Sequence, residues 1–481
     1  MLVYSPPFPL IVYYDKRQRL SAQDEKGALL ALQKRDRVHS IELRASASNL
    51  DKILAVMNGP FPKLEDLALS VKYNGWGEPP NCPRFPSAFE APRLRHLNLN
   101  QILGEKGFSH LPSLSGLQYL RLTGILEPPD IPLECLASCL LTMPQLEYLG
   151  LGFDTSFATD DIWRKEVDVP NAKWIPLPKL SELFFSGDSI YLDGLAARIS
   201  APSLEKVYVT FLKEPTSTLS HLSRLLSAAK KLKYPIASIE FSGTQVDDSK
   251  VTIRMCGLEQ TIECWPQFAG FQIVFRCWPL NVQVASAGQI CAALTSMFSE
   301  VKKLHLYLEG ARWQPAQGGD IVEDATWHGL LGPFRKVEKL QIDPCLVWDL
   351  TLALGSNDVP RSREILPELC KLTRPDYARF REAFDEFIAG RQEVGQHIRK
   401  CRRPPMPWFG EDDKDSGGEE DESEDDGKDE QEQGDSESES RDSDSWTSDG
   451  SGCCTELDSD YDRGVSSLRY RFIDRPSNIR Y

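Results

Sequence analysis

The side chains that could do chemistry in this sequence are few and scattered. Seven histidines occur, and the pairs closest to a ligand spacing are His397 with Cys401 and Cys135 with Cys139, each four residues apart. One such pair supplies two ligands, whereas a structural zinc site takes four. The sequence contains no zinc-protease, phosphate-loop, dinucleotide-binding or serine-hydrolase motif. We therefore expect no catalytic residue, no metal, no cofactor and no enzymatic activity.

The twelve cysteines and the N-terminus indicate the compartment. The cysteines lack the regular spacing of a disulfide framework, so we interpret them as buried thiols in a reducing environment. The apolar run Leu10 to Tyr14 is short and follows prolines, unlike the apolar core of a signal peptide. No run of about 18 apolar residues occurs, so we expect no membrane span and a cytoplasmic or nuclear location.

Charge is concentrated in one acidic tail. Residues 411–462 hold 24 Asp and Glu against three Lys and Arg, while the rest of the chain holds 52 basic and 47 acidic residues. Such a tail cannot bury apolar surface, so we expect it to be disordered. Three readings stay open for it: a solvating extension, a substrate of acidophilic kinases, or a binder of basic proteins such as histones. Four serines with an acidic residue three positions on would suit the kinases: Ser416, Ser423, Ser436 and Ser459.

Leucines, in contrast, recur in a regular pattern. The motif is an apolar residue and a proline, followed by L-x-x-L-x-L. It occurs as FPKLEDLALS from Phe61, APRLRHLNLN from Ala91, MPQLEYLGLGF from Met143, LPKLSELFFSG from Leu177, APSLEKVYVTF from Ala201 and, with an earlier proline, LSGLQYLRLTG from Leu114. Weaker copies begin at Val38, Tyr234, Val301 and Phe334. The first apolar residues of eight copies lie at 38, 64, 94, 117, 146, 180, 204 and 236, close to the spacing of about 20 to 29 residues in leucine-rich repeats.

Each repeat predicts a strand followed by a helical return. The last two apolar residues of the motif are two apart and therefore share one face of a strand. Helical patterns lie between the motifs: SAQDEKGALLALQKRD, LDKILAVM, LECLASCLL, LDGLAARIS, STLSHLSRLLSAAKKLK and GQICAALTSMFSEVKKL. We therefore predict an α/β fold, a leucine-rich-repeat-like solenoid with a parallel sheet and the right-handed crossovers that such sheets adopt.

The side chains between the leucines face outward and form the candidate binding surface. They are Asp66, Ala68, Ser70, His96, Asn98, Asn100, Tyr119, Arg121, Thr123, Tyr148, Glu182, Phe184, Lys206 and Tyr208, with Gly150, Gly152, Ser186 and Thr210 in the same positions. Tyrosine and arginine are frequent in interface hot spots, which favours binding. The alternative is that each is only a solvated strand position.

The pattern changes along the second half of the chain. Between Ser242 and Ser299, the stretches VTIRM, FQIVFRCW and NVQVAS indicate strands, either of decayed repeats, which we favour, or of a small insertion. From about residue 360 we expect a helical cap that covers the open end of the solenoid. The predicted domains are a solenoid with its cap over 1–400, a proline-rich linker over 401–410, the acidic disordered tail over 411–463 and a basic, aromatic segment over 464–481.

The order of these segments resembles that of mushroom-type fungal F-box proteins with degenerate leucine-rich repeats. The resemblance spans residues 7–397. It is carried by PFPLIVYYD from Pro7, SAQDEKGALLALQKRDRVHSIELR from Ser21, the proline-led repeats, and ILPELCKL with FDEFIAGRQEVGQ near the end. It implies a ubiquitin-ligase substrate receptor, in which an F-box binds the cullin-ligase adaptor and the repeats hold the target. No L-P-x-E-type F-box precedes Pro7, so we expect a truncated gene model or a stand-alone repeat protein.

These observations predict a non-enzymatic protein–protein recognition module, similar to a substrate receptor without its F-box. The expected partner is a protein target, and the cullin-ligase adaptor only if an F-box exists upstream. We expect no nucleic-acid partner, since the charges of the body form no basic cluster in the sequence. The alternative function places the activity in the acidic tail, as a chaperone-like binder of histones or other basic proteins.

Overall fold

The computed structural model describes the part of the chain that carries the repeats. The chain divides into Met1–Arg403 and Pro404–Tyr481, and every described residue belongs to the first unit. The described residues are 8–15, 22–71, 83, 85–86, 88–102, 114–125, 131–154, 174–215, 219–242, 249–257, 270–309, 322–347, 349–350, 353, 365–374, 385, 388–389, 391–392 and 397–402. The acidic tail, the C-terminal segment and most of the expected linker lie outside them. No helix within the described residues is long and apolar enough to cross a membrane.

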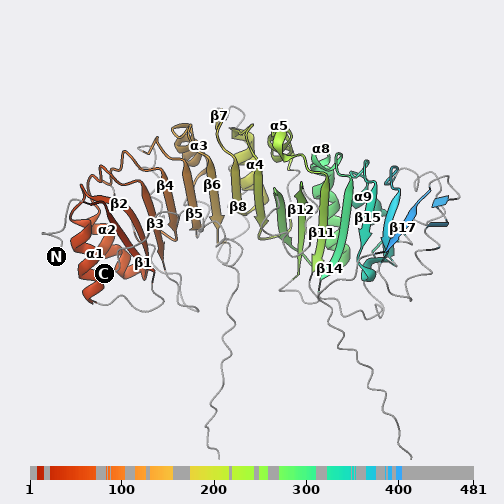
Figure 1. Ribbon diagram of the computed structural model, residues 1–481, viewed down its shortest axis with the longest axis horizontal. Helices are drawn as coiled ribbons and strands as arrows, with labels where there is room; N and C mark the ends of the chain where they lie inside the picture. Colours follow the sequence, from red (N-terminus) through yellow and green to blue (C-terminus); the bar gives the residue numbers. More distant parts are fainter. Residues whose placement is uncertain are drawn as a thin grey trace, which may run out of the picture. The chain divides into compact units, whose positions relative to one another are not determined.

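One long sheet organises this unit (Figure 1). Fifteen strands of described residues lie in the order β1-β2-β3-β4-β5-β6-β8-β10-β13-β12-β11-β14-β15-β16-β17. Their bounds are β1 (Leu10–Asp15), β2 (Val38–Ala45), β3 (Asp66–Val71), β4 (His96–Asn100), β5 (Tyr119–Ile125), β6 (Tyr148–Phe153), β8 (Glu182–Gly187), β10 (Lys206–Phe211), β11 (Ile236–Ser242), β12 (Lys250–Cys256), β13 (Phe271–Arg276), β14 (Lys303–Glu309), β15 (Lys339–Ile342), β16 (Lys371–Arg374) and β17 (Arg399–Arg402). A separate pair joins β7 (Ile175–Pro176) to β9 (Ile199–Ser200). The mixed α/β class with a mainly parallel sheet is confirmed, whereas the handedness of the crossovers stays a prediction.

A tight turn before each strand explains the proline of the repeat. The N–H of Leu64 donates to the carbonyl of Phe61 at 3.2 Å, which places Pro62 at the second position of the turn. Proline suits that position because its ring fixes φ near −65°. The same bond is donated in the other clear copies by Leu94, Leu117, Leu146, Leu180 and Leu204. The turn sets the start of the strand in each of these six copies and therefore the register between these strands.

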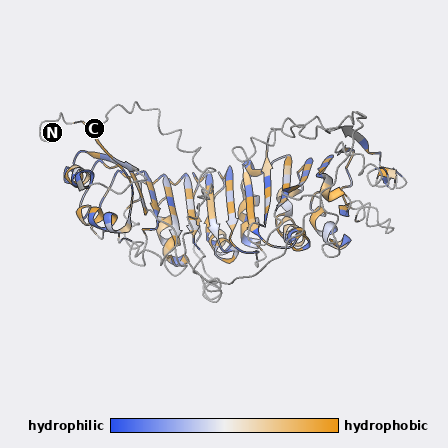
Figure 2. Cartoon of the chain, turned by 90° about the horizontal axis from the view of Figure 1, so that it is seen from below, coloured by the Kyte–Doolittle hydropathy of each residue, from blue (hydrophilic) through white to orange (hydrophobic). Residues whose placement is uncertain are grey.

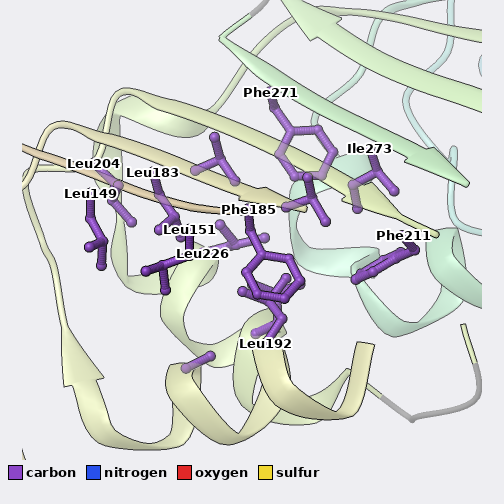
Figure 3. Close-up of a cluster of buried hydrophobic side chains, with 14 of the residues drawn as sticks. Leu149, Leu151, Leu183, Phe185, Leu192, Leu204, Phe211, Leu226, Phe271 and Ile273 are labelled. Atoms are coloured by element: carbon purple, nitrogen blue, oxygen red, sulfur yellow. The ribbon is translucent and has the colours of Figure 1, made fainter. Parts of the chain in front are cut away.

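The leucines that follow the turn form a continuous buried ladder. In register from β3 to β10 lie Leu67, Leu97, Leu120, Leu149, Leu183 and Val207, each at most 1% exposed. Helices lie along this face of the sheet (Figure 2). Figure 3 shows Leu192 of helix α4 and Leu226 of helix α5 beneath Phe185 and the strand leucines. The core is thus a layer between sheet and helices, and no described helix covers the opposite face of the sheet.

Most helices lie in return segments that the sequence predicts as helical, whereas α9 and the first turns of α7 were not predicted. The described helices are α1 (Ala22–Leu32), α2 (Ala47–Val56), α3 (Leu133–Leu141), α4 (Ser189–Arg198), α5 (Ser220–Ala228), α7 (Leu280–Ala293), α8 (Thr295–Phe298) and α9 (Asp324–Leu331), with 3-10 turns η5 (Lys230–Leu232) and η7 (Pro344–Leu346). Some are capped by neighbouring units. The carboxylate of Asp193 in α4, for example, accepts the N–H groups of His221 and Leu222 at the start of α5, each at 2.9 Å.

The segment between Ser242 and Ser299 is an insertion, so the prediction of decayed repeats is wrong. Strand β12 runs antiparallel to both β11 and β13, and β13 lies beside β10. A decayed repeat would keep the parallel direction, because each repeat returns through a crossover. The chain passes from β10 over two sheet positions to β11 and then fills those positions with β12 and β13. NVQVAS, predicted as a strand, belongs to helix α7.

The anchor assigned to Ile236 is also wrong. The side chains of β11 that join the main core are Ala237, Ile239 and Phe241, each fully buried. Ile236 pairs in register with Lys303 and belongs to a small cluster on the other face of the sheet. Ile239 and Phe241, the second and third apolar residues of the predicted copy, are buried in the main core as predicted, so only the first residue of that copy is misplaced.

The sheet continues where a helical cap was expected. Strand β16 pairs in parallel with β15, and β17 pairs in parallel with β16. The N–H of Leu369 donates to the carbonyl of Leu366 at 3.1 Å, as in the repeats upstream. ILPELCKL is therefore one more repeat, and the described residues beyond 364 include two strands in addition to short helical pieces. Strand β17 also crosses the expected boundary at residue 400.

Candidate recognition surface

The open face of the sheet, called the outward face below, carries all fourteen candidate residues in three rows. The first row from β2 to β10 consists of Ser40, Asp66, His96, Tyr119, Tyr148, Glu182 and Lys206. The second row consists of Glu42, Ala68, Asn98, Arg121, Gly150, Phe184 and Tyr208. The third row contains Arg44, Ser70, Asn100 and Thr123 and, beyond an irregularity after Leu122 in β5, Gly152, Ser186 and Thr210. The face that the sequence predicts for these residues is the one they occupy.

Neighbours in the first row complement each other in charge and shape. Nδ1 of His96 lies 2.5 Å from a carboxylate oxygen of Asp66, and Nζ of Lys206 donates to Glu182 at 2.7 Å. Cross-strand pairs of opposite charge stabilise a sheet. The ring centroid of His96 lies 6.2 Å from that of Tyr119, and Tyr119 in turn stacks on Tyr148. The row is therefore a chain of contacts across adjacent strands.

Two stacked tyrosines form the centre of the first row. The rings of Tyr119 and Tyr148 are 4.2 Å apart and nearly parallel, with an interplanar angle of 11°. Tyr148 is only 8% exposed although it lies on the open face. Burial raises the pKa of the Tyr148 phenol well above its usual range, and Tyr119 raises it further. The Tyr148 phenol therefore presents a neutral hydroxyl group, which can donate and accept hydrogen bonds.

A glycine beside this stack lets an arginine reach across a strand. The guanidinium carbon of Arg121 on β5 lies 5.7 Å from the ring centroid of Phe184 on β8, with Gly150 of β6 between them. A Cβ at Gly150 would lie 2.9 Å from Cε1 of Tyr148 and 3.2 Å from Cγ of Arg121. The absent side chain thus makes room for both neighbours. We call Tyr119, Arg121, Tyr148 and Phe184 the aromatic cluster.

The remaining candidates surround this cluster with polar groups. Nδ2 of Asn100 donates to Oγ of Ser70 at 3.2 Å in the third row. Burial, followed by the charge of Glu182, raises the pKa of Tyr208 to about 12. Apart from the buried Tyr148, the fourteen candidates are half-buried, with side chains that border solvent. The surface therefore combines an aromatic centre with polar flanks, as protein interfaces do.

The outward face continues over the insertion, which sequence reasoning did not include. Arg254 of β12 forms an ion pair with Glu240 of β11 and donates to Gln272 of β13 at 3.3 Å. Beyond them, the phenol of Tyr307 lies 3.0 Å from Nδ1 of His305 on β14. The signal that could have revealed these residues is the alternation of VTIRM and FQIVF, once the strands are aligned as a hairpin.

A pocket of about 290 Å³ opens near the start of the downstream strands. It is lined by Pro235, Ile236, Gly257, Lys302, Lys303, Glu338 and Lys339. Its walls combine apolar side chains with lysines, and none of these residues was a sequence candidate. No group of three or more His, Cys, Asp or Glu that could hold a metal occurs among the described residues. Burial raises the pKa of Cys139 to about 11, in keeping with an inert thiol.

Comparisons with known proteins add little beyond these observations. No protein-family model and no curated protein matches the chain. Among solved structures, the leucine-rich repeat-containing protein LegL7 from Legionella pneumophila matches 79% of this chain and 97% of its own, at 10% identity and a TM-score of 0.26. So low a score does not establish a shared fold. The leucine-rich-repeat-like character rests on the recurring turn and the in-register leucine ladder.

Proposed function

We propose that this chain is a non-enzymatic protein-recognition module that binds a partner protein on its outward face. The observation that carries the proposal is the aromatic cluster, which lies at the centre of a continuous, partly exposed surface. Tyrosine and arginine are enriched among residues that dominate binding energy, and they act from the middle of a patch with polar surroundings. A stacked pair with a fixed arginine also loses little side-chain entropy on binding.

The size of the surface suits a protein better than a small molecule. The rows cross seven strands from β2 to β10, and neighbouring strands lie about 4.8 Å apart, so the face extends roughly 29 Å. Specific interfaces cover about 800 Å² per partner, which a face of this length can supply. Small-molecule sites, in contrast, are enclosed and largely apolar.

The finer role is that of a substrate receptor in an F-box ubiquitin ligase. It is supported by the order of the repeats, which resembles that family. In this role the aromatic cluster would hold the target, and a cullin-ligase adaptor would bind only through an F-box encoded upstream. Co-purification of the adaptor with a chain extended upstream on the genome, but not with Met1–Tyr481, is the expected result. Recovery of the adaptor by the shorter chain would contradict the absence of an F-box.

The test of the surface compares two variants. Affinity capture with mass spectrometry first identifies partners of the full chain, and their binding is then measured with Arg121→Ala/Phe184→Ala. Loss of a hot spot of 2 kcal/mol or more weakens binding at least about 30-fold. The control is Lys63→Ala, an exposed position in the turn before β3, which should bind as the wild type does. Equal binding by both variants would refute the proposal.

A second candidate function rests on the acidic tail. With 24 acidic against three basic residues, residues 411–462 would attract histones or other basic proteins. Deletion of residues 411–463 separates the two functions. Partner binding that survives this deletion and depends on Arg121 supports the outward face, whereas binding lost on deletion supports the tail.

A further inference from the structure

Four cationic side chains lie side by side on the last four strands of the sheet. In register across β14, β15, β16 and β17 are Lys303, Lys339, Lys371 and Arg399. In β14, β15 and β16 they directly precede the buried leucine of the strand, which is the position of the first row upstream. We call these four residues the basic row. Three of its side chains are half-buried and Arg399 is exposed.

The basic row opposes folding. Parallel neighbours are about 4.8 Å apart, and like charges directly opposite each other destabilise a sheet. Within the described part of the chain, no carboxylate lies within ion-pair distance of Lys339, Lys371 or Arg399. Glu338 pairs with Lys302 at 3.3 Å instead. Contacts among the described residues therefore do not compensate the charges of Lys339, Lys371 and Arg399, whereas an external anion would.

The pocket described above adjoins the basic row. Lys303 and Lys339 of the row line it. A ligand there meets these two cations, the ion pair of Lys302 with Glu338, and an apolar wall. Ile236 is only 4% exposed, and it packs with Cys256 apart from the main core. A site of this composition suits a chain that carries both acidic and apolar side chains.

We propose that the basic row and its pocket bind an acidic segment of a partner protein. This inference deepens the proposed function and rests on it. The segment crosses the strands in extended form, with carboxylates over the cations and one apolar side chain in the pocket. The basic row spans three strand spacings, roughly 14 Å, which about five residues of extended peptide cover. Side chains on one face of such a peptide recur about every 6.7 Å, so three carboxylates can face the four cations.

An acidic protein segment fits this row better than nucleic acid does. The cations form a line one residue wide, flanked in the next row by His305, Gln341 and Thr373. Nucleic-acid binding uses a broad basic face and many phosphate contacts. A narrow line of cations beside an apolar pocket instead matches a single peptide strand.

The experiment titrates the full chain with a labelled peptide and follows fluorescence anisotropy at low salt. The probe is a dodecapeptide of alternating glutamate and glycine that begins with leucine, and its counterpart has glutamine at every glutamate. Lys339→Glu/Lys371→Glu should weaken binding of the glutamate peptide at least tenfold. The charge-matched control is Lys63→Glu/Lys179→Glu, at two exposed turn positions, and it should change binding less than twofold. The glutamine peptide should bind none of the three proteins.

Several outcomes would overturn the inference. They are equal weakening by the row variant and the charge-matched control, no binding of the glutamate peptide, or tighter binding of a DNA duplex that depends on the same lysines. The same titration on the chain without residues 411–463 tests competition by that acidic segment. The inference is supported if the shortened chain binds the peptide more tightly than the full chain does and if this gain is lost in Lys339→Glu/Lys371→Glu. That result would mean that the tail and the peptide compete for the same cations.

Failure of this inference can be distinguished from failure of the proposed function. If Arg121→Ala/Phe184→Ala abolishes partner binding while the row variant binds the peptide normally, the inference fails and the proposed function stands. If neither variant affects any partner, both fail. Weakening by the row variant of both the peptide and the captured partner supports the two together.

Discussion

The same position of the repeat is filled in opposite ways at the two parts of the sheet. In β3 to β10 the residue before the buried strand leucine finds a complementary neighbour: aspartate beside histidine, tyrosine beside tyrosine, glutamate beside lysine. In β14 to β17 the equivalent residues are all cations. The leucine ladder beneath this position continues through β16, and Lys400 of β17 pairs with its last leucine, Leu372. The comparison teaches that the repeat determines which face of each strand is buried and how the strands align. It does not determine which residues occupy the outward positions.

The largest expected effect comes from breaking the stacked tyrosines. Tyr148→Ala removes a nearly buried ring and its contact with Tyr119, so we expect a loss of roughly 2–4 kcal/mol in the free energy of unfolding. Urea denaturation followed by circular dichroism measures it. Tyr148→Phe keeps the stack and should cost about 1 kcal/mol or less. A similar loss for both variants would mean that the hydroxyl group, and not the stack, stabilises this row.

Crowding at Gly150 should have the next largest effect. Gly150→Ala places a Cβ 2.9 Å from the Tyr148 ring, and the strain should cost about 1–3 kcal/mol. The matched control is Gly116→Ala, where the closest atom would be 3.7 Å away, with an expected change within about 0.5 kcal/mol. Calorimetric melting of both variants checks the difference. Equal melting temperatures would show that Tyr148 and Arg121 move aside easily.

Reversing one first-row charge in each part of the sheet should change the free energy of unfolding in opposite directions. Lys339→Glu places a carboxylate between Lys303 and Lys371 and should stabilise the fold by about 0.2–1 kcal/mol. Glu182→Lys places a cation beside Lys206 and should destabilise it by a similar amount. Both differences should shrink at high salt, because salt screens exposed charges. Effects of the same sign would contradict the comparison between the two parts.

The smallest effect is expected for the exposed pair of Asp66 and His96. Their side chains are 47% and 31% exposed, so solvent screens the interaction. A double-mutant cycle with Asp66→Asn and His96→Gln should give a coupling of a few tenths of a kcal/mol. A coupling above about 1 kcal/mol would mean that the first row is held together by charge as well as by stacking.

The upstream repeats could be predicted because two local signals agree. Proline fixes the turn, and leucines two apart fix the buried face, so the outward residues follow by alternation. The aromatic cluster could not be predicted in detail. It depends on the side chain missing at Gly150 and on the register of three strands, which repeats of unequal length do not reveal.

The downstream part departs from expectation where these signals fail. Alternating apolar residues do not encode strand direction, so the antiparallel β12 resembled another repeat. NVQVASAGQI alternates as a strand does, but it belongs to helix α7. Gly288 of this helix packs closely against α9, since a Cβ there would lie 3.2 Å from the Leu330 nitrogen. ILPELCKL resembled a helix, although Leu366 and Pro367 begin the same turn as upstream.

The insertion of β12 and β13 has a consequence for cooperativity. In repeat proteins, stability is transmitted mainly between neighbouring units, and folding spreads from one unit to the next. Here β10 and β11 are successive in the repeat order but three places apart in the sheet. Communication through the sheet between the aromatic cluster and the basic row must therefore pass through a hairpin made of later residues. We therefore expect the two surfaces to open separately, and amide hydrogen exchange would then resolve them as distinct protection classes.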